Sequence, residues 1–586
     1  MQGIRIVVGI DFGTTYSGFS YAHLSNPTIA SNNKWVDQDS DTDTTNNEYL
    51  DQIENIKTAT VLGYDEKFEK VECWGHSIFT AEQKNKVHPV ELFKLHMCDS
   101  DKDSDKDKKS NKSDSKLHLP PNIDYRRAIT DYLREMGKQL FEIHIQIKKT
   151  LTTRWPGIEW NSVLFILAVP ADFPEKSKAI LRKCAFDAEL ITKIKTHKLQ
   201  FTTEPEAAAI YCIDNIIPKD NISDYIEKSF LVVDCGGGTV DLTIRKLLSK
   251  DKLGEVTVRT GGLCGSTYID DEFIKFLDNK LGKSAISGLK ENHYGQYRVL
   301  IQEFCRNVKL PFTGIEEDYN TYELDIRKIC PKLKQYITKQ QHTDENRSII
   351  KFAFDDVRKM FDPVINQIIK LIRDQLNKDD TCSTIFLVGG FSESKYLQKR
   401  IREEFKEKDV LVPPRPIAAV ANGAVSYGIN KKFIKNRVLK YNYGRSTLRL
   451  YDENIDTEDF RRRESGHVLI FKLLARKGTI VDVDQKFSET SHPERSDQDK
   501  LWYQILIAEK DDVKYPDEEG VIKLGDFIVD LPDVHLGQDK RRVKFELCFG
   551  DLEIQAYARN EYNGKEYHTK FDYYDKDLVE ILNESK

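Results

Sequence analysis

The stretch LVVDCGGGTVDLT at 231–243 holds the residues whose types and spacing most suggest chemistry. An apolar strand leads into three consecutive glycines that stand between Asp234 and Asp241. Glycine has no side chain, so its backbone N–H groups can approach phosphate oxygens closely. A glycine run after a strand is also an ordinary structural turn, and this stretch alone does not distinguish the two.

A second turn of the same design lies in VVGIDFGTTYSGFSYA at 7–22. Both turns have a strand, an aspartate, glycine and then threonine, and the hydroxyls of Thr14, Thr15 and Thr239 can donate hydrogen bonds to phosphate. Asp11 and Asp234 would repel bare phosphate, so they make sense only beside a hydrated Mg²⁺, which keeps its waters and takes carboxylates around them. Two such hairpins facing each other would hold a triphosphate from both sides.

A third glycine turn is IFLVGGFSES at 385–394, where Gly389 and Gly390 follow a buried strand. Glycines here would let the chain pass close to a flat base or ribose. Ser392 or Ser394 is a candidate cap for the helix that begins next. By itself this motif is equally consistent with a plain strand-to-helix turn.

The elements that must position these turns alternate between strand and helix. Buried strands are predicted within 163–170, 230–234 and 384–392, and a helix follows the first of them. A long amphipathic helix is predicted over 354–376, with a kink or break at Pro363. This alternation predicts an α/β domain with buried sheets, whereas the strand-like runs from about 438 onward predict a separate β domain.

Bulk composition narrows the class of protein. The 586 residues predict two to four domains, and a net charge of -6 gives no indication of a nucleic-acid or anionic-membrane partner. No apolar run reaches the roughly 20 residues of a membrane helix, the start is not a signal peptide, and the ten cysteines form no CxxC pair, so we expect a reducing, cytoplasmic location. The low-complexity stretch 99–116 is predicted to be a disordered insertion, and 37–48 is similarly polar.

The three turns in this order resemble the superfamily of actin, hexokinase and the heat-shock ATPases. LAVPADFPEKSK at 167–178, TTEPEAAAIY at 202–211 and PIAAVANGAV at 416–425 are similar to the 70-kDa heat-shock (DnaK-type) chaperones. GGLCGSTYIDDEF at 261–273 and ARKGTIV at 475–481 are closer to the divergent member-twelve-like branch of that family. The resemblance covers residues 4 to about 430.

This resemblance implies a two-lobed, actin-like (ribonuclease-H-like) ATPase domain at 1–436 that binds ATP or ADP with Mg²⁺. It implies an all-β, sandwich-like domain at 437–586 that would hold polypeptide, and the expected lack of a helical lid after this domain is a departure from the family. The catalytic residues that it implies are Asp11, Lys94, Glu204, Asp234 and Thr239, with Asp11 and Asp234 holding Mg²⁺ through water. The cofactor-binding residues that it implies are Gly13, Thr14, Thr15, Tyr16, Gly236, Gly237, Gly238, Thr239, Glu303, Arg306, Gly389 and Gly390. Lys94 could equally be a solvated lysine on the surface.

The chain also departs from the family pattern. Lys178 stands where the family has an arginine, and a lysine offers a point charge in place of a planar fork. Glu393 lies close to the position of an arginine that stacks on the base, and Ile417 replaces an aspartate beside the ribose. The junction at 431–444 is basic and does not copy the family's linker. These changes predict weaker nucleotide binding and altered coupling.

The function predicted from these features is that of a chaperone-like, stress-response protein. It would hydrolyse ATP slowly and couple hydrolysis to the binding of unfolded or extended polypeptides, with co-chaperones as further partners. One alternative is a nucleotide-sensing regulatory or scaffold protein with an inactive cleft. Another, from a different class, is a small-molecule kinase of the same superfamily, for which the sequence offers no acceptor pocket.

Overall fold

The structure is a computed structural model, and the chain in it divides into two compact units. The residues that it describes are 3–33, 35, 56–78, 87–97, 119–120, 122–137, 160–171, 173–337, 348–462, 466–549 and 552–570. The first unit comprises Met1–Phe173, Leu181–Arg245 and Arg259–Lys431, and the second comprises Pro174–Ile180, Lys246–Val258 and Lys432–Lys586. Both polar stretches noted above, 37–48 and 99–116, lie outside the described residues.

One six-stranded sheet of the first unit has the order β3-β2-β1-β8-β9, with β4 paired to β2. Its strands are β1 Ile6–Asp11, β2 Tyr16–His23, β3 Asn26–Ser31, β4 Thr58–Ala59, β8 Val163–Val169 and β9 Leu199–Thr203. Strands β1 and β2 form an antiparallel hairpin in which Asp11 lies opposite Gly18, and β1 pairs with β8 in parallel. Every residue of β1 and β8 is buried, as expected for central parallel strands.

A second six-stranded sheet has the order β12-β11-β10-β16-β17, with β13 paired to β11. Its strands are β10 Ser229–Cys235, β11 Val240–Ser249, β12 Lys252–Glu255, β13 Thr260–Gly262, β16 Thr384–Val388 and β17 Asp409–Leu411. The strand predictions at 163–170, 230–234 and 384–392 are therefore confirmed. Because β10 and β16 run in parallel, the turns that follow them leave the sheet at the same edge.

Two helices of the first unit, α5 Glu204–Ile216 and α12 Ala419–Ile429, pack against each other at close range. A Cβ on Gly423 would lie 1.8 Å from the carbonyl oxygen of Ala207, so only glycine permits this helix contact. Helix α12 also packs on β1 and β8, and α5 packs on β10. This helix pair therefore joins elements of both six-stranded sheets.

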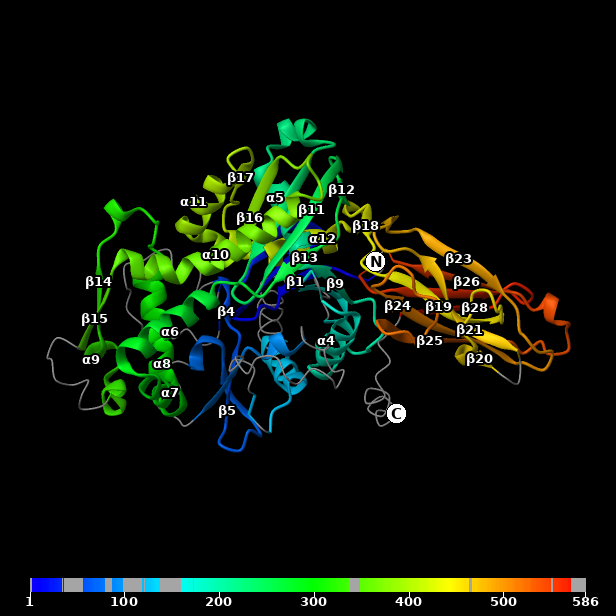
Figure 1. The fold of residues 1–586 in the computed structure, drawn as a ribbon, viewed down its shortest axis with the longest axis horizontal. Coiled ribbons are helices and arrows are strands. Elements are labelled where there is room, and N and C mark those ends of the chain that lie inside the picture. Colours follow the sequence, from blue (N-terminus) through cyan, green and yellow to red (C-terminus); the bar gives the residue numbers. More distant parts are fainter. Residues whose placement is uncertain are drawn as a thin grey trace. The chain divides into compact units, whose positions relative to one another are not determined.

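The remaining elements of the first unit are mainly helical, and Figure 1 shows α6, α7 and α8 together near β14 and β15. The helices are α4 Glu175–Asp187 (shared by the two units), α6 Thr267–Leu281, α7 Lys283–Asn292, α8 Tyr294–Phe304, α9 Ile326–Ile329, α10 Phe354–Leu376 and α11 Lys395–Glu404, with residues 125–137 also helical. The short strands are β5 Val61–Tyr64, β6 Val71–Trp74, β7 His88–Glu91, β14 Tyr322–Asp325 and β15 Ile349–Phe352.

Two helix predictions can be compared with these elements. Helix α10 has the bounds predicted for the long amphipathic helix, and it continues through Pro363, so of the predicted kink or break the structure excludes the break. Proline removes one backbone donor, and burial of the apolar face of α10, which includes Phe361, Ile365 and Ile368, offsets that loss. Ser394 is the N-cap of α11, since its hydroxyl accepts from the N–H of Leu397 at 3.3 Å.

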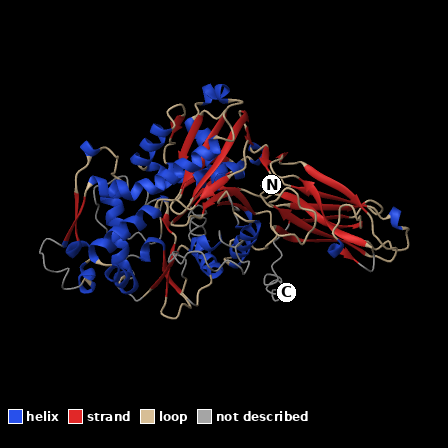
Figure 2. Cartoon of the chain, viewed as in Figure 1, coloured by secondary structure: helices blue, strands red, loops and turns tan. Residues whose placement is uncertain are grey.

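The second unit is built of strands and loops over almost all of its described length, as Figure 2 shows. A five-stranded sheet has the order β20-β21-β19-β24-β25, a four-stranded sheet has the order β23-β26-β27-β28, and β18 pairs with β22. The strands are β18 Asn436–Val438, β19 Asn442–Leu450, β20 Arg461–Arg462, β21 His467–Ala475, β22 Ile480–Asp482, β23 Lys486–Ser491, β24 Lys500–Ala508, β25 Val521–Asp530, β26 Val543–Cys548, β27 Gln555–Asn560 and β28 Glu566–Lys570. Both larger sheets supply side chains to one core, including Tyr503, Phe527 and Phe545.

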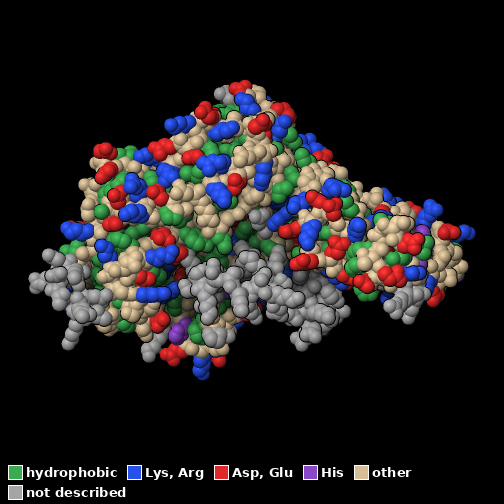
Figure 3. Space-filling model, viewed as in Figure 1, with side chains coloured by type: hydrophobic (Ala, Val, Ile, Leu, Met, Phe, Trp, Pro, Cys, Tyr) green, Lys and Arg blue, Asp and Glu red, His purple; other side chains and the backbone are tan. Residues whose placement is uncertain are grey.

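Three further features of the described residues concern the surface charge, the helices and the cysteines. Figure 3 shows acidic and basic side chains interspersed over the face in view. Among the described residues, no helix is both long and apolar enough to cross a bilayer. The nine cysteines that the structure describes are free thiols.

Candidate functional site

A cavity of about 1450 Å³ opens inside the first unit, and the three glycine turns meet around it. The predicted site residues that line it are Asp11, Gly13, Thr14, Thr15, Tyr16, Lys94, Glu204, Asp234, Gly236, Gly237, Gly238, Thr239, Gly389 and Gly390. They come from segments that are far apart in the sequence. The fold therefore gathers residues that were selected only by local motif.

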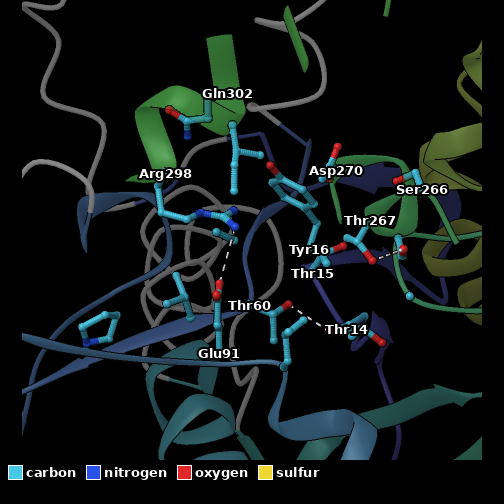
Figure 4. Close-up of a pocket in the computed structure, with 18 of the residues that line it drawn as sticks. Thr14, Thr15, Tyr16, Thr60, Glu91, Ser266, Thr267, Asp270, Arg298 and Gln302 are labelled. Carbon is cyan, nitrogen blue, oxygen red and sulfur yellow. Dashed lines mark hydrogen bonds and ion pairs between the residues drawn. The ribbon is translucent and has the colours of Figure 1, made fainter. Parts of the chain in front are cut away.

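The first turn, between β1 and β2, is fixed by hydrogen bonds around Gly13. The N–H of Gly13 donates to Ser17 Oγ at 3.1 Å, and Thr60 Oγ1 donates to the carbonyl oxygen of Gly13 at 3.0 Å. A Cβ on Gly13 would lie 2.1 Å from the carbonyl oxygen of Tyr16, so the turn requires glycine. These contacts hold Thr14 and Thr15 at the tip, facing the cavity (Figure 4).

The second turn, between β10 and β11, is held by the start of α6. The N–H and Oγ1 of Thr267 both donate to the carbonyl oxygen of Gly237, each at 2.9 Å. The N–H of Ser266 donates to the carbonyl oxygen of Gly236 at 3.1 Å. A Cβ on Gly265 would lie 2.3 Å from the same Gly237 oxygen, so this approach of α6 requires a residue without a side chain. With its carbonyls occupied in this way, the turn keeps a fixed shape.

The tips of these two turns touch. A Cβ on Gly237 would lie 2.0 Å from Thr15 Oγ1, and a Cβ on Gly238 would lie 3.0 Å from Thr14 Cγ2. The two threonines therefore rest against bare backbone of the opposite turn. Hydroxyls from one turn and peptide groups from the other thus share one small volume, which is the arrangement expected of a site for a chain of phosphates.

The third turn, after β16, passes directly over Asp234. Gly389 has a φ of 82°, and a Cβ there would lie 2.4 Å from Asp234 Oδ1. At Gly390 a Cβ would lie 3.7 Å from Ile417 Cδ1, which is ordinary contact. Gly389 is therefore required by both conformation and space, whereas Gly390 borders an apolar part of the cavity.

Two buried ion pairs set the charge of the site. Lys57 Nζ lies 2.5 Å from Asp11 Oδ2, and Lys94 Nζ lies 2.8 Å from Glu204 Oε1. All four side chains are at most 11% exposed. The prediction that Lys94 is a solvated surface lysine is wrong, because its 3₁₀ helix Phe93–Met97 turns it inward onto Glu204. Lys57 belongs to no glycine motif, and the sequence analysis missed it.

The acidic groups perturb one another. Burial raises the pKa of Asp234 well above its usual value, and the nearby carboxylates of Glu204, Asp11 and Asp241 raise it further. Burial also raises the pKa of Glu204, although Lys94 opposes this effect. Asp241 itself accepts from the N–H of Ala171 at 2.8 Å. The cavity therefore concentrates negative charge that a cation would relieve.

Charged residues outside the glycine motifs line another part of the cavity. Arg298 of α8 lies 3.5 Å from Glu91 of β7, and Lys309 donates to Asp270 Oδ1 at 2.7 Å. In the view of Figure 4 the ring of Tyr16 stands between Arg298 and Thr267. No glycine motif marks these residues, which come from the end of β7, from α6 and α8, and from the π-helical turn Cys305–Lys309.

Several predicted residues lie elsewhere. Glu303 and Arg306 do not line the cavity that the described residues form, and Glu303 instead accepts from Asn307 at 2.8 Å. In the same stretch Gln302, Cys305 and Lys309 line the cavity. Lys178 lies in the second unit, where it pairs with Glu175 and donates to the carbonyl oxygen of Leu552 at 2.6 Å.

The residues present suit Mg²⁺ held through its water shell. Asp11 and Asp234, which line the cavity, offer the carboxylate oxygens that Mg²⁺ takes. Within the part of the chain that is described, no three His, Cys, Asp or Glu side chains are grouped to ligate a metal directly. An ion that keeps most of its waters and bridges to phosphate requires no such group.

Comparison with known proteins gives three findings. A family model described as a domain of unknown function (DUF8340) matches residues 224–413. The chain is 24% identical to Heat shock 70 kDa protein 12A of Mus musculus, over 95% of this chain and 90% of that protein, and 22% identical to Heat shock 70 kDa protein 12B of Homo sapiens, over 94% and 89%. It is also 22% identical to Chaperone protein HscA of Buchnera aphidicola subsp. Baizongia pistaciae, over 72% and 70%.

Proposed function

Since the chain is a divergent, member-twelve-like relative of the 70-kDa heat-shock proteins, we propose that its first unit binds ATP or ADP with Mg²⁺ and hydrolyses ATP slowly. The observation that carries this proposal is the meeting of three glycine turns around one cavity, with buried carboxylates and lysines beside them. Backbone amides and hydroxyls suit phosphates, and the lysines offset their charge.

We infer a two-lobed, actin-like fold at 1–436, followed by a β-sandwich at 437–586. The pairing of α5 with α12 between elements of two six-stranded sheets supports the first assignment. The five-stranded and four-stranded sheets, which share one core, support the second.

In the proposed site, the turn tips at 13–15 and 236–239 bind the phosphates, and Asp11 and Asp234 hold the waters of Mg²⁺. When bound, the ion supplies positive charge that stabilises the charge developing on the transferred phosphoryl group. Lys94 adds a fixed cation at the same place, and Glu204 orients Lys94 through the 2.8 Å ion pair. Asp234, whose pKa is raised by burial and by the neighbouring carboxylates, also orients the attacking water.

The nucleoside end of the ligand is proposed to lie against the third turn. Gly389 and Gly390 leave room for a flat group, and Ile417 gives that wall an apolar surface. Lys309, held by Asp270, lines the cavity, whereas the predicted Arg306 does not. An apolar wall without a carboxylate for the ribose hydroxyls supports the prediction of modest nucleotide affinity.

For the second unit we propose the binding of unfolded or extended polypeptides. Trp502 of β24 lies opposite Ile528 of β25, and these side chains are 64% and 46% exposed. Leu448 and Leu469 form a cross-strand pair in the same sheet. Exposed apolar side chains of this kind on a sheet are common in surfaces that contact other proteins. Co-chaperones as partners and a cytoplasmic, stress-related role remain part of the proposal.

Binding and turnover are tested separately. Isothermal titration of the full chain with ATP and Mg²⁺ should give saturable heat at one site, and phosphate release should be slow but measurable. Asp234→Asn should retain ATP binding and lose phosphate release, since the amide cannot hold the waters of Mg²⁺ in the same way. Turnover that is unchanged in Asp234→Asn would contradict the assigned role. Binding without any phosphate release in the unmodified protein would favour the nucleotide-sensing scaffold, and formation of ADP without phosphate release, only when a polyol is added to accept the phosphoryl group, would favour the kinase.

A further inference from the structure

Lys57 sits immediately before β4 and reaches the phosphate region from outside every recognised motif. Its Nζ donates to Asp11 Oδ2 at 2.5 Å, and it lines the same cavity as the glycine turns. The side chains of Lys57 and Asp11 are 11% and 6% exposed. A lysine buried to this extent must have its charge compensated, and Asp11 provides that compensation.

The backbone beside Lys57 is shaped to admit its side chain. Gly18 of β2 lies directly opposite Asp11 in the β1–β2 hairpin. A Cβ on Gly18 would lie 2.9 Å from Lys57 Cγ and 2.9 Å from the carbonyl oxygen of Ile56. Any larger residue at 18 would displace the lysine stem that leads to Asp11. The contact is therefore built into the hairpin.

The charges around the cavity show what Lys57 does. Asp11, Glu204 and Asp234 line the cavity, whereas Lys57 and Lys94 supply one positive charge each. Lys94 is engaged with Glu204, so Lys57 is the cation beside Asp11. It occupies one oxygen of a carboxylate that would otherwise be available to a hydrated cation, and it places an ammonium group beside the first phosphate turn.

We propose that Lys57 is a resident counter-cation of the phosphate site, which positions Asp11 and makes nucleotide binding depend only weakly on Mg²⁺. This inference rests on the proposed function, because it concerns the same cavity. Lys57 acts through Asp11 and through its charge, so it is a positioning residue.

The test measures ATP affinity of the full chain by isothermal titration, once with excess Mg²⁺ and once with EDTA. For the unmodified protein we expect the two dissociation constants to differ by less than about tenfold. For Lys57→Met we expect the ratio of the EDTA value to the Mg²⁺ value to rise by about tenfold or more, because the metal must then supply the missing charge. Lys57→Arg should restore most of the original ratio.

Two controls separate this role from a structural one. Lys275→Met removes an exposed lysine of α6 and should leave the ratio unchanged. Gly18→Ala keeps the charge but displaces Lys57, so its ratio should rise in the same direction as that of Lys57→Met. Thermal unfolding of each variant checks that it is folded.

The outcomes are distinct. If the unmodified protein binds ATP with Mg²⁺ but loses more than about tenfold in affinity with EDTA, the role of Lys57 is refuted and the proposed function stands. This comparison requires no variant, so it decides the matter even if Lys57→Met fails to fold. If the unmodified protein binds ATP under neither condition, the proposed function itself fails, and the inference fails with it.

Discussion

Replacing Lys94 by methionine should destabilise the protein in a strongly pH-dependent way. The Lys94–Glu204 pair is 2.8 Å long, and its side chains are 5% and 9% exposed. Removing one partner of a buried pair costs about 3–5 kcal/mol, because the remaining charge is left without compensation. Glu204 can avoid part of this cost by taking up a proton, and its pKa is already raised by burial and by Asp11.

The direction of the pH effect follows from the number of bound protons. Lys94 is the main influence that lowers the pKa of Glu204, so the substitution raises that pKa further above its usual value. Between the unfolded and folded pKa values the folded state binds more protons than the unfolded state. The free energy of unfolding therefore falls as pH rises, by up to about 1.4 kcal/mol per pH unit.

Urea unfolding measures the effect. At about pH 8 Lys94→Met should lower the free energy of unfolding by about 3–5 kcal/mol relative to the unmodified protein. At lower pH the loss should be smaller, because the Glu204 carboxyl of the variant, whose pKa is raised by burial and no longer lowered by Lys94, takes up a proton. Lys275→Met is the matched control, since the Lys275–Glu272 pair is exposed and should contribute less than about 0.5 kcal/mol at either pH. Equal losses at both pH values would refute this account of Glu204.

Three further results are expected. Gly237→Ala should weaken ATP binding by about tenfold or more in isothermal titration, because its Cβ would lie 2.0 Å from Thr15 Oγ1 and would push the turns apart. Unchanged affinity would show that the turn tips do not hold the ligand. Glu206→Gln should lower the free energy of unfolding by about 3–5 kcal/mol, because it leaves Arg245, 3.4 Å away and fully buried, without its carboxylate; a loss below about 1 kcal/mol would contradict this. Trp502→Ser should change the free energy of unfolding by less than about 0.5 kcal/mol but weaken the binding of a fluorescent, reduced and unfolded polypeptide. Equal binding by the variant and the unmodified protein would show that the surface around Trp502 does not bind polypeptide.

The sequence predicted the parts of the site that depend on local backbone chemistry. Glycines that follow an apolar strand identified the turns at Gly13, Gly237 and Gly389, because these conformations and close approaches leave few alternatives. The strand at 163–170 and the long helix at 354–376 were also readable, since each is a complete apolar pattern with clear ends.

The sequence could not predict contacts that only the fold creates. Lys57 meets Asp11 because β4, which follows Lys57, pairs with β2 of the β1–β2 hairpin. No spacing along the chain encodes this contact. Arg298 and Lys309 face the cavity because of how α8 and the following π-helical turn Cys305–Lys309 are rotated, which a shift of one residue would change. Pro363 does not end α10, because burial of one helix face outweighs the loss of a single backbone hydrogen-bond donor.

The second unit is not a contiguous stretch of polypeptide, and this has a consequence for anyone who dissects the protein. It recruits Lys246–Val258 from the interior of the sequence, where Glu255 accepts from the N–H of Val438 at 2.8 Å and its own N–H donates to Asn436 at 2.9 Å. A fragment that starts near residue 432 would lack these two hydrogen bonds, and its first strand, β18, would lose part of the contacts that hold it in place. The unit therefore cannot be moved to another protein as its C-terminal stretch alone, and any such transfer should include residues 246–258.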